Sequence, residues 1–158
     1  SAFIRDLTQI KKAEQELELA AITFESHSGI VITDDKKRIL RVNPAMEKMT
    51  GYRAEEMVGE YPSMLKSGKQ NDEFYKEMWQ QINREGNWSG ELWNKRKDGE
   101  LYAEYLTITS VEDKTDQVTH YVGTSNNITE RKNAEIKIAQ LAYYDELTDL
   151  ANRRLLLD

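Results

Sequence analysis

The sequence lacks cysteine entirely, and it has no apolar run long enough to cross a membrane. Without cysteine there can be no disulfide, thiolate nucleophile, cysteine-ligated metal or cysteinyl cofactor adduct. A membrane-spanning helix needs roughly 20 apolar residues, and no signal peptide opens the chain. We therefore expect a cytoplasmic segment that makes no membrane contact of its own, although its parent protein can carry membrane helices elsewhere.

Positive charge is also scarce, because 22 Lys and Arg residues face 28 Asp and Glu residues and leave a net charge of −6. The average field repels phosphate backbones, which makes nucleic acid a poor candidate partner. Hydrophobic residues make up 39% of the chain, including three Trp and eight Tyr, so a well-filled core is expected. The length of 158 residues fits one globular domain with extensions.

The first 24 residues predict an amphipathic helix. Residues 6–24 are rich in good helix formers and contain neither Gly nor Pro. Apolar residues recur there at steps of three and four, namely Ile10, Ala13, Leu17, Ala20 and Phe24. Such a stripe favours a two-stranded seam between two copies of the chain. The alternative is a single helix that lies on its own domain.

The middle of the chain predicts a sheet covered by helices. Residues 29–33 and 38–42 indicate a hairpin, and Asn43 and Gly51 begin and end a helix. Residues 54–58 add a helical turn, and a longer helix starts at Asn71 or Asp72 and stops at Gly86. Its apolar stripe, typical of a helix laid on a sheet, comprises Phe74, Tyr75, Met78, Trp79 and Ile82.

Three further strands complete the domain, at residues 88–97, 101–111 and 118–128, and Thr129 is the predicted cap of a final helix. Two strands, several short helices and three strands predict an α+β fold with a five-stranded antiparallel sheet and helices on one face. The segment from Asp6 to Glu14 resembles the one from Asn127 to Glu135, as a domain ending repeated in a tandem array would.

The chain therefore divides into four predicted parts. Residues 1–24 form a linker helix that ends a preceding repeat, and residues 25–128 form the domain. Residues 129–144 form a second linker helix, and residues 145–158 form the truncated start of another domain. The two helices flank the domain on its N- and C-terminal sides.

The predicted order of elements, with Asn43-Pro44-Ala45 and Thr50-Gly51-Tyr52, resembles the PAS family of sensory domains over roughly residues 22–132. The most specific stretches are Phe74-Tyr75, Met78-Trp79, Trp88-x-Gly90-Glu91 and residues 94–99. Residues 127–132 resemble the closing PAC motif that joins PAS domains to an output helix. The family usually has Asp at position 127. Asn127 keeps the hydrogen bonding of that side chain but removes its charge, so an Asp–Arg ion pair at the end of the sheet is in doubt.

The tail resembles a second family. Asp145-x-Leu147-Thr148-x-Leu150-x-Asn152-Arg153-Arg154 is similar to the opening of GGDEF domains. The resemblance implies a bacterial parent that is a diguanylate cyclase, which makes cyclic di-GMP from GTP, and an EAL phosphodiesterase domain can follow in such proteins. The catalytic loop and metal-binding acids of that family are absent from this sequence, so we expect no enzymatic activity from the segment itself.

The PAS resemblance implies a pocket between sheet and helices that holds a flavin such as FAD, a haem, a small acid or nothing. Trp88-x-Gly90 with residues 94–99 looks like the flavin-binding PAS domains of redox sensors. A Trp can flank the flavin ring and an Asn can meet its polar edge, but an empty pocket or a small metabolite is favoured over flavin. The candidate pocket residues are Asn43, Trp79, Trp88, Glu91 and Asn94.

Two other ligand chemistries are disfavoured. Haem-binding relatives place a His on the long helix, and residues 71–84 contain none; the two histidines are His27 and His120. The blue-light mechanism of related domains needs a cysteine adduct, which this sequence cannot form. No metal site is predicted, and no nucleophile or acid–base set supports an independent enzyme.

Two functions remain in view. The leading hypothesis is a sensory relay that acts through paired flanking helices of a homodimer on a downstream diguanylate cyclase. The alternative is a ligand-free dimerisation module that only spaces and pairs the catalytic domains. Occupancy of the pocket distinguishes the two.

Overall fold

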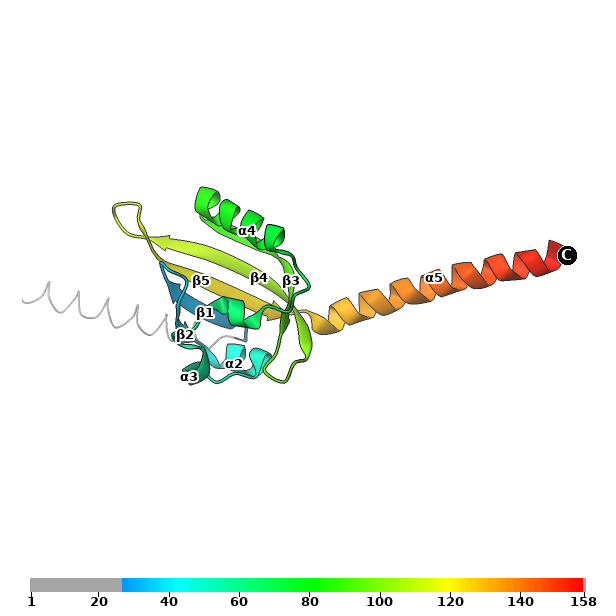
Figure 1. The fold of residues 1–158 in the computed structure, drawn as a ribbon, viewed down its shortest axis with the longest axis horizontal. Helices are drawn as coiled ribbons and strands as arrows, with labels where there is room; N and C mark the ends of the chain where they lie inside the picture. The colour runs from blue at the N-terminus through cyan, green and yellow to red at the C-terminus, as the bar shows by residue number, and fades with distance from the viewer. Residues whose placement is uncertain (1–26, 158) are drawn as a thin grey trace, which may run out of the picture. The chain divides into compact units, whose positions relative to one another are not determined.

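The computed structural model describes the backbone of residues 27–157 and the side chains of residues 27–151 (Figure 1). These residues fall into two compact units, one ending at Asn127 and the other beginning at Ile128. The predicted N-terminal helix, and with it the linker at residues 1–24, lies outside the described residues.

The first unit is built on one antiparallel sheet. Its strands are β1 (Gly29–Asp34), β2 (Ile39–Val42), β3 (Asn87–Lys95), β4 (Leu101–Glu112) and β5 (Val118–Asn127). They lie in the order β2-β1-β5-β4-β3, so the last strand occupies the middle of the sheet, with the first strand beside it (Figure 1). The five-stranded antiparallel α+β prediction is confirmed.

One face of the sheet carries the helices. These are α2 (Pro44–Thr50), α3 (Ala54–Met57), the 3-10 helix η1 (Pro62–Leu65) and α4 (Asp72–Glu85). Helix α2 contacts β1, α3 contacts β2, and α4 contacts β3 and β4. Two apolar clusters fill the layer between sheet and helices, one around Met57 and the other around Ile82.

Asn43 joins the start of the sheet to the start of α2. Its side-chain Oδ1 accepts hydrogen bonds from the backbone N–H of Met46 (3.0 Å) and of Ile30 (2.8 Å), while Nδ2 donates to the Ser28 carbonyl (2.8 Å). The first of these is the predicted helix cap. The other two hold the beginning of β1 against the helix.

Helix α4 begins and ends where the sequence predicts. The Asn71 side chain accepts from the Phe74 N–H at 2.9 Å, and Gly86 ends the helix at φ +82°. Met78 and Ile82 are its buried residues. The other three residues of the predicted stripe are half-buried. Tyr75 and Trp79 pack against the Ile82 cluster and also line the cavity, whereas Phe74 packs edge-on against Tyr75 and Trp88.

The segment around η1 was not predicted from the sequence. Its continuation from Lys66 to Gln70 lies along strand β3, at the edge of the sheet. The backbones of Lys66 and Asn94 form an isolated antiparallel β-bridge, and Ser67 Oγ donates a hydrogen bond to the Trp93 carbonyl at 2.8 Å. The Gln70 amide donates to the same carbonyl and accepts from the Trp93 N–H. Because side chains make most of these bonds, no strand or helix pattern marks the segment.

The second unit consists of helix α5 (Thr129–Leu157). Thr129, the predicted cap, is instead the first helical residue, because the Ile128 carbonyl already accepts the first helical bond, from the Lys132 N–H. The helix continues across the predicted boundary between residues 144 and 145, and that boundary stays a prediction. Among the described residues, no helix is both long and apolar enough to span a bilayer.

Replacing Asn43 with Ala should lower the free energy of unfolding by about 3 kcal/mol, because it removes a helix cap and leaves buried backbone groups without partners. Asn71→Ala is the matched control: it removes a cap without a second link to the sheet and should cost about 1 kcal/mol. Urea denaturation followed by circular dichroism measures both. Equal losses would show that the bonds to Ile30 and Ser28 contribute nothing.

Candidate functional site

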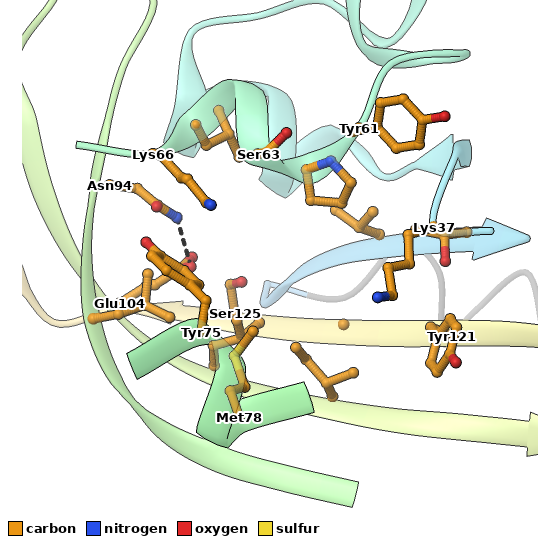
Figure 2. Close-up of a pocket in the computed structure, with 18 of the residues that line it drawn as sticks. Lys37, Tyr61, Ser63, Lys66, Tyr75, Met78, Asn94, Glu104, Tyr121 and Ser125 are labelled. Atoms are coloured by element: carbon orange, nitrogen blue, oxygen red, sulfur yellow. Dashed lines mark hydrogen bonds between the residues drawn. The ribbon is translucent and has the colours of Figure 1, made fainter. Parts of the chain in front are cut away.

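A cavity of about 370 Å³ lies between the sheet and the helices, within the size range of small-molecule sites. Its floor is the helix-facing side of β1, β3, β4 and β5, and its walls come from α2, η1 and α4 (Figure 2). The apolar lining residues are Val31, Met46, Leu65, Met78, Trp79, Leu92, Leu106 and Ile108.

Strand pleating explains this lining. Residues at every second position of a strand share a face, so Leu92 and Asn94 on β3 face the helices together. The register pairs Leu106 with Ser125 and Ile108 with Gly123, which places all four on the same face. Gly123 has no side chain and therefore leaves the middle of the floor open.

A hydrogen-bonded carboxyl group lies in the floor. Glu104, only 3% exposed, accepts a bond at 2.7 Å from Asn94 Nδ2 (Figure 2). A hydrogen bond from the Ser125 side chain also favours its charged form. Burial disfavours the charged form and raises the pKa of the Glu104 carboxyl to about 7, although both hydrogen bonds act in the opposite direction. At neutral pH this carboxyl group can therefore accept or donate a proton.

The hydroxyl of Tyr102 lies beside this pair. Tyr102 is the register partner of Asn94 and is buried, and its hydroxyl makes no hydrogen bond of good geometry among the described residues. Burial and the neighbouring Glu104 carboxylate raise the pKa of the Tyr102 phenol, while the Asn94 amide lowers it. This part of the sheet thus has hydrogen-bonding capacity that the protein itself does not use.

The lining also contains three lysines, at positions 37, 66 and 76. Lys37 Nζ lies 3.9 Å from the centre of the Trp79 ring, and Lys66 Nζ lies 4.2 Å from the centre of the Tyr75 ring. Figure 2 shows the ammonium groups of Lys37 and Lys66 directed into the cavity from two sides. The cavity therefore combines an apolar interior with cations in a protein of net negative charge.

The structure brings two of the five predicted site residues into the cavity lining, Trp79 and Asn94. Asn43 is fully buried outside the lining, and its amide is used in the three bonds that hold β1 and α2. Glu91 lies on the opposite face of β3 and is exposed. Trp88 faces the helices but packs beyond the cavity, edge-on against Phe74.

The Trp88-x-Gly90 motif has a structural reason. Trp88 and Gly90 lie two residues apart on the same face of β3, and a Cβ atom at position 90 would come within 2.6 Å of the Trp88 indole. Glycine at position 90 therefore makes room for the tryptophan ring. Ring packing accounts for this part of the motif without a ligand.

Sequence reasoning missed Glu104, Ser125 and the lysines. A signal for Glu104 was available, because alternation along β4 puts it in the same row as Tyr102, Leu106 and Ile108. A carboxyl group in a buried apolar row is a candidate site residue. The predicted hairpin places Lys37 in its turn, but nothing in the sequence indicated the left-handed φ of +71° at this residue or its place in the cavity lining.

The comparisons point to one family. The family model described as a PAS domain matches residues 27–130. The nitrogen fixation regulatory protein of Klebsiella oxytoca is 34% identical over 100 residues, which cover 63% of this chain and 20% of that protein. The bacterioopsin transcriptional activator of Halobacterium salinarum is 31% identical over 153 residues, covering 94% of this chain and 22% of that protein.

A solved structure is also similar to this chain. The LOV domain of the blue-light activated histidine kinase of Erythrobacter litoralis is 25% identical with a TM-score of 0.59, and the match covers 65% of this chain and 96% of that one. The chain spans about a fifth of the length of the two curated relatives. Their complete activities therefore extend beyond what this segment contains.

Protonation of Glu104 should couple stability to pH. Folding raises the pKa of the Glu104 carboxyl from about 4.5 in the unfolded chain to about 7. The contribution of this group to stability is therefore fully present below pH 4.5 and is lost as pH rises through 7. Relative to Glu104→Gln, the wild-type chain should lose up to about 3 kcal/mol of unfolding free energy between pH 4.5 and pH 8.

Urea denaturation across this pH range measures the difference, and Glu77→Gln, at an exposed site on α4, is the control that should follow the wild type. Parallel pH profiles for the wild type and Glu104→Gln would show that the folded-state pKa of Glu104 is not raised.

Proposed function

Because this chain belongs to the PAS domain family and is a sensory signalling domain, we propose that it binds a small molecule in its cavity and relays the state of that ligand through α5 to a downstream diguanylate cyclase. The observation that carries the proposal is the apolar cavity with the Asn94–Glu104–Ser125 group in its floor.

A flavin is the first ligand to test, and the residues of the cavity fit one. A flavin ring is flat and largely apolar, with N–H and carbonyl groups along one edge. The apolar walls suit the ring, and the polar floor suits that edge: Asn94 Oδ1 can accept from an N–H group, and a protonated Glu104 can donate to a carbonyl. A bound flavin would supply reversible electron transfer.

The same network suggests how the signal leaves the cavity. Any change that alters the charge of Glu104 alters its hydrogen bonds with Asn94 on β3 and Ser125 on β5. Strand β5 ends at Asn127, two residues before α5 begins. A shift in β5 therefore acts on the segment that continues into the output helix. The absence of cysteine means that this relay operates without a covalent flavin adduct.

The proposed output rests on the tail of the chain. Asp145-x-Leu147-Thr148 and the residues after it resemble the opening of GGDEF domains. A diguanylate cyclase must bring two GTP sites face to face, so a paired helix connector is a suitable control element. Helix α5 has exposed apolar residues with which to pair, including Ile136, Tyr143 and Leu150 at intervals of seven.

The exposed apolar residues of α5 also support the alternative function, a ligand-free module that pairs the catalytic domains. That function needs the helix but leaves the cavity without a role. Measuring what the cavity holds therefore separates the alternatives.

The purified chain should retain a flavin, visible as absorption bands in the near ultraviolet and blue and as a flavin mass released by mild denaturant. Asn94→Ala should lower the retained flavin about tenfold, because it removes a buried hydrogen-bonding group from the ligand site. Asn87→Ala, at an exposed position of the same strand, should leave it unchanged. A colourless chain that releases no small molecule would favour the dimerisation module.

The chain should be a dimer in sedimentation velocity, and Leu150→Glu should shift it toward monomer by placing a charge in the apolar seam. Lys137→Glu introduces the same side chain at an exposed position of α5 outside the seven-residue repeat and should leave the dimer intact. A wild-type monomer at micromolar concentration, or equal behaviour of the two variants, would contradict pairing through α5.

A further inference from the structure

The backbone at Lys37 is strained at the rim of the cavity. Lys37 has φ +71°, in the left-handed region where residues other than glycine are disfavoured. The turn is held by Asp34, whose Oδ1 accepts from the N–H groups of Lys36 and Arg38 at 2.9 Å each. The Lys37 side chain is directed into the cavity (Figure 2), and backbone strain of this kind is found most often at functional sites.

The Lys37 ammonium group has no carboxylate partner. Among the described residues, none lies within ion-pair distance of its Nζ, although burial lowers the pKa of this lysine by removing water. The two nearest acids along the chain do not pair with it: the carboxylate of Asp34 holds the turn, and no ion pair joins Asp35 to Lys37 in the described part of the chain. Within the described part of the chain, the interaction found for the ammonium group is with the face of the Trp79 ring, whose centre lies 3.9 Å from Nζ.

A second lysine, Lys66, also lines the cavity, from an exposed position just after η1. Lys66 stacks on Tyr75, which lies one helical turn before Trp79 on α4. The two aromatic rings are therefore neighbours on one face of the helix, about 6 Å apart along its axis. Lys76 also lines the cavity, and Glu104 in the floor is the one acid in the lining.

We propose that the ligand of this cavity carries a carboxylate or phosphate group, which Lys37 and Lys66 bind at the rim while its apolar body fills the interior. This inference rests on the proposed ligand-binding function and adds the charge of the ligand. The cation–π contacts alone offset only part of the cost of a strained backbone and a desolvated ammonium group. An anion between the two lysines would supply the missing partner.

A matched pair of fluorescent probes tests the proposal on the purified chain. 8-Anilinonaphthalene-1-sulfonate and N-phenyl-1-naphthylamine have the same apolar body, and only the first carries an anionic group. The wild-type chain should bind the sulfonate more tightly than the neutral probe. Lys37→Met and Lys66→Met should each reduce that preference about fivefold, because each removes one of the two ammonium groups directed into the cavity.

Two further variants separate charge from folding. Lys114→Met removes an exposed lysine from the β4–β5 turn and should leave the preference unchanged. Lys37→Gly removes the ammonium group and relieves the left-handed strain, so it should fold at least as stably as the wild type and still lose the preference. Displacement of the sulfonate by 1-naphthyl phosphate or by 1-naphthoate identifies which anion the site binds better.

The outcomes are distinct. Equal binding of both probes, or a preference that survives Lys37→Met and Lys66→Met, would overturn the anion site while leaving the ligand-binding function standing. The probes are added after any retained ligand has been removed by mild denaturant and the chain refolded. Failure of both probes to bind the emptied chain would overturn the ligand-binding function and this inference with it.

Discussion

The buried amide of Asn43 is the interaction on which the rest of the domain depends. With one side chain it caps α2, accepts from the backbone of Ile30 and donates to the backbone of Ser28. Because β1 lies inside the sheet, between β2 and β5, these bonds link the helical layer directly to a strand of the cavity floor. Because protein interiors are close-packed, a fixed link between sheet and helices favours a cavity that keeps its shape.

The elements that the sequence predicts well are those with local signals. Helices α2 and α4 have an Asn before and a Gly after them, and the strands show alternation or a hairpin turn between them. The segment from η1 to Gln70 was missed because its structure comes from side-chain bonds to β3, which neither periodicity nor capping residues encode. Local chemistry thus predicts the sheet and its helices, and contacts between distant segments decide the rest.

The site was harder to predict than the fold for the same reason. Asn43 and Trp88 were predicted as site residues because amide and aromatic side chains suit a ligand. In the fold, Asn43 holds β1 against α2 and Trp88 packs over Gly90, which only their positions reveal. Glu104 and Lys37 are charged residues of common types. Glu104 is unusual because its carboxyl group is buried, and Lys37 is unusual because its backbone is left-handed. The chemistry of a site residue depends on the groups around it, and the fold decides which groups those are.

The pairing of Gln70 with strand β3 has a consequence for a protein proposed to work as a dimer. An exposed sheet edge offers unpaired backbone groups to any neighbouring chain and invites aggregation or domain swapping. The Gln70 amide satisfies both the N–H and the carbonyl of Trp93, as a residue of an adjacent strand would. Two copies held close together, or repeats in tandem, are thereby discouraged from extending the sheet into one another at this edge. Association between copies is then left to other surfaces, whose contacts can form and separate reversibly.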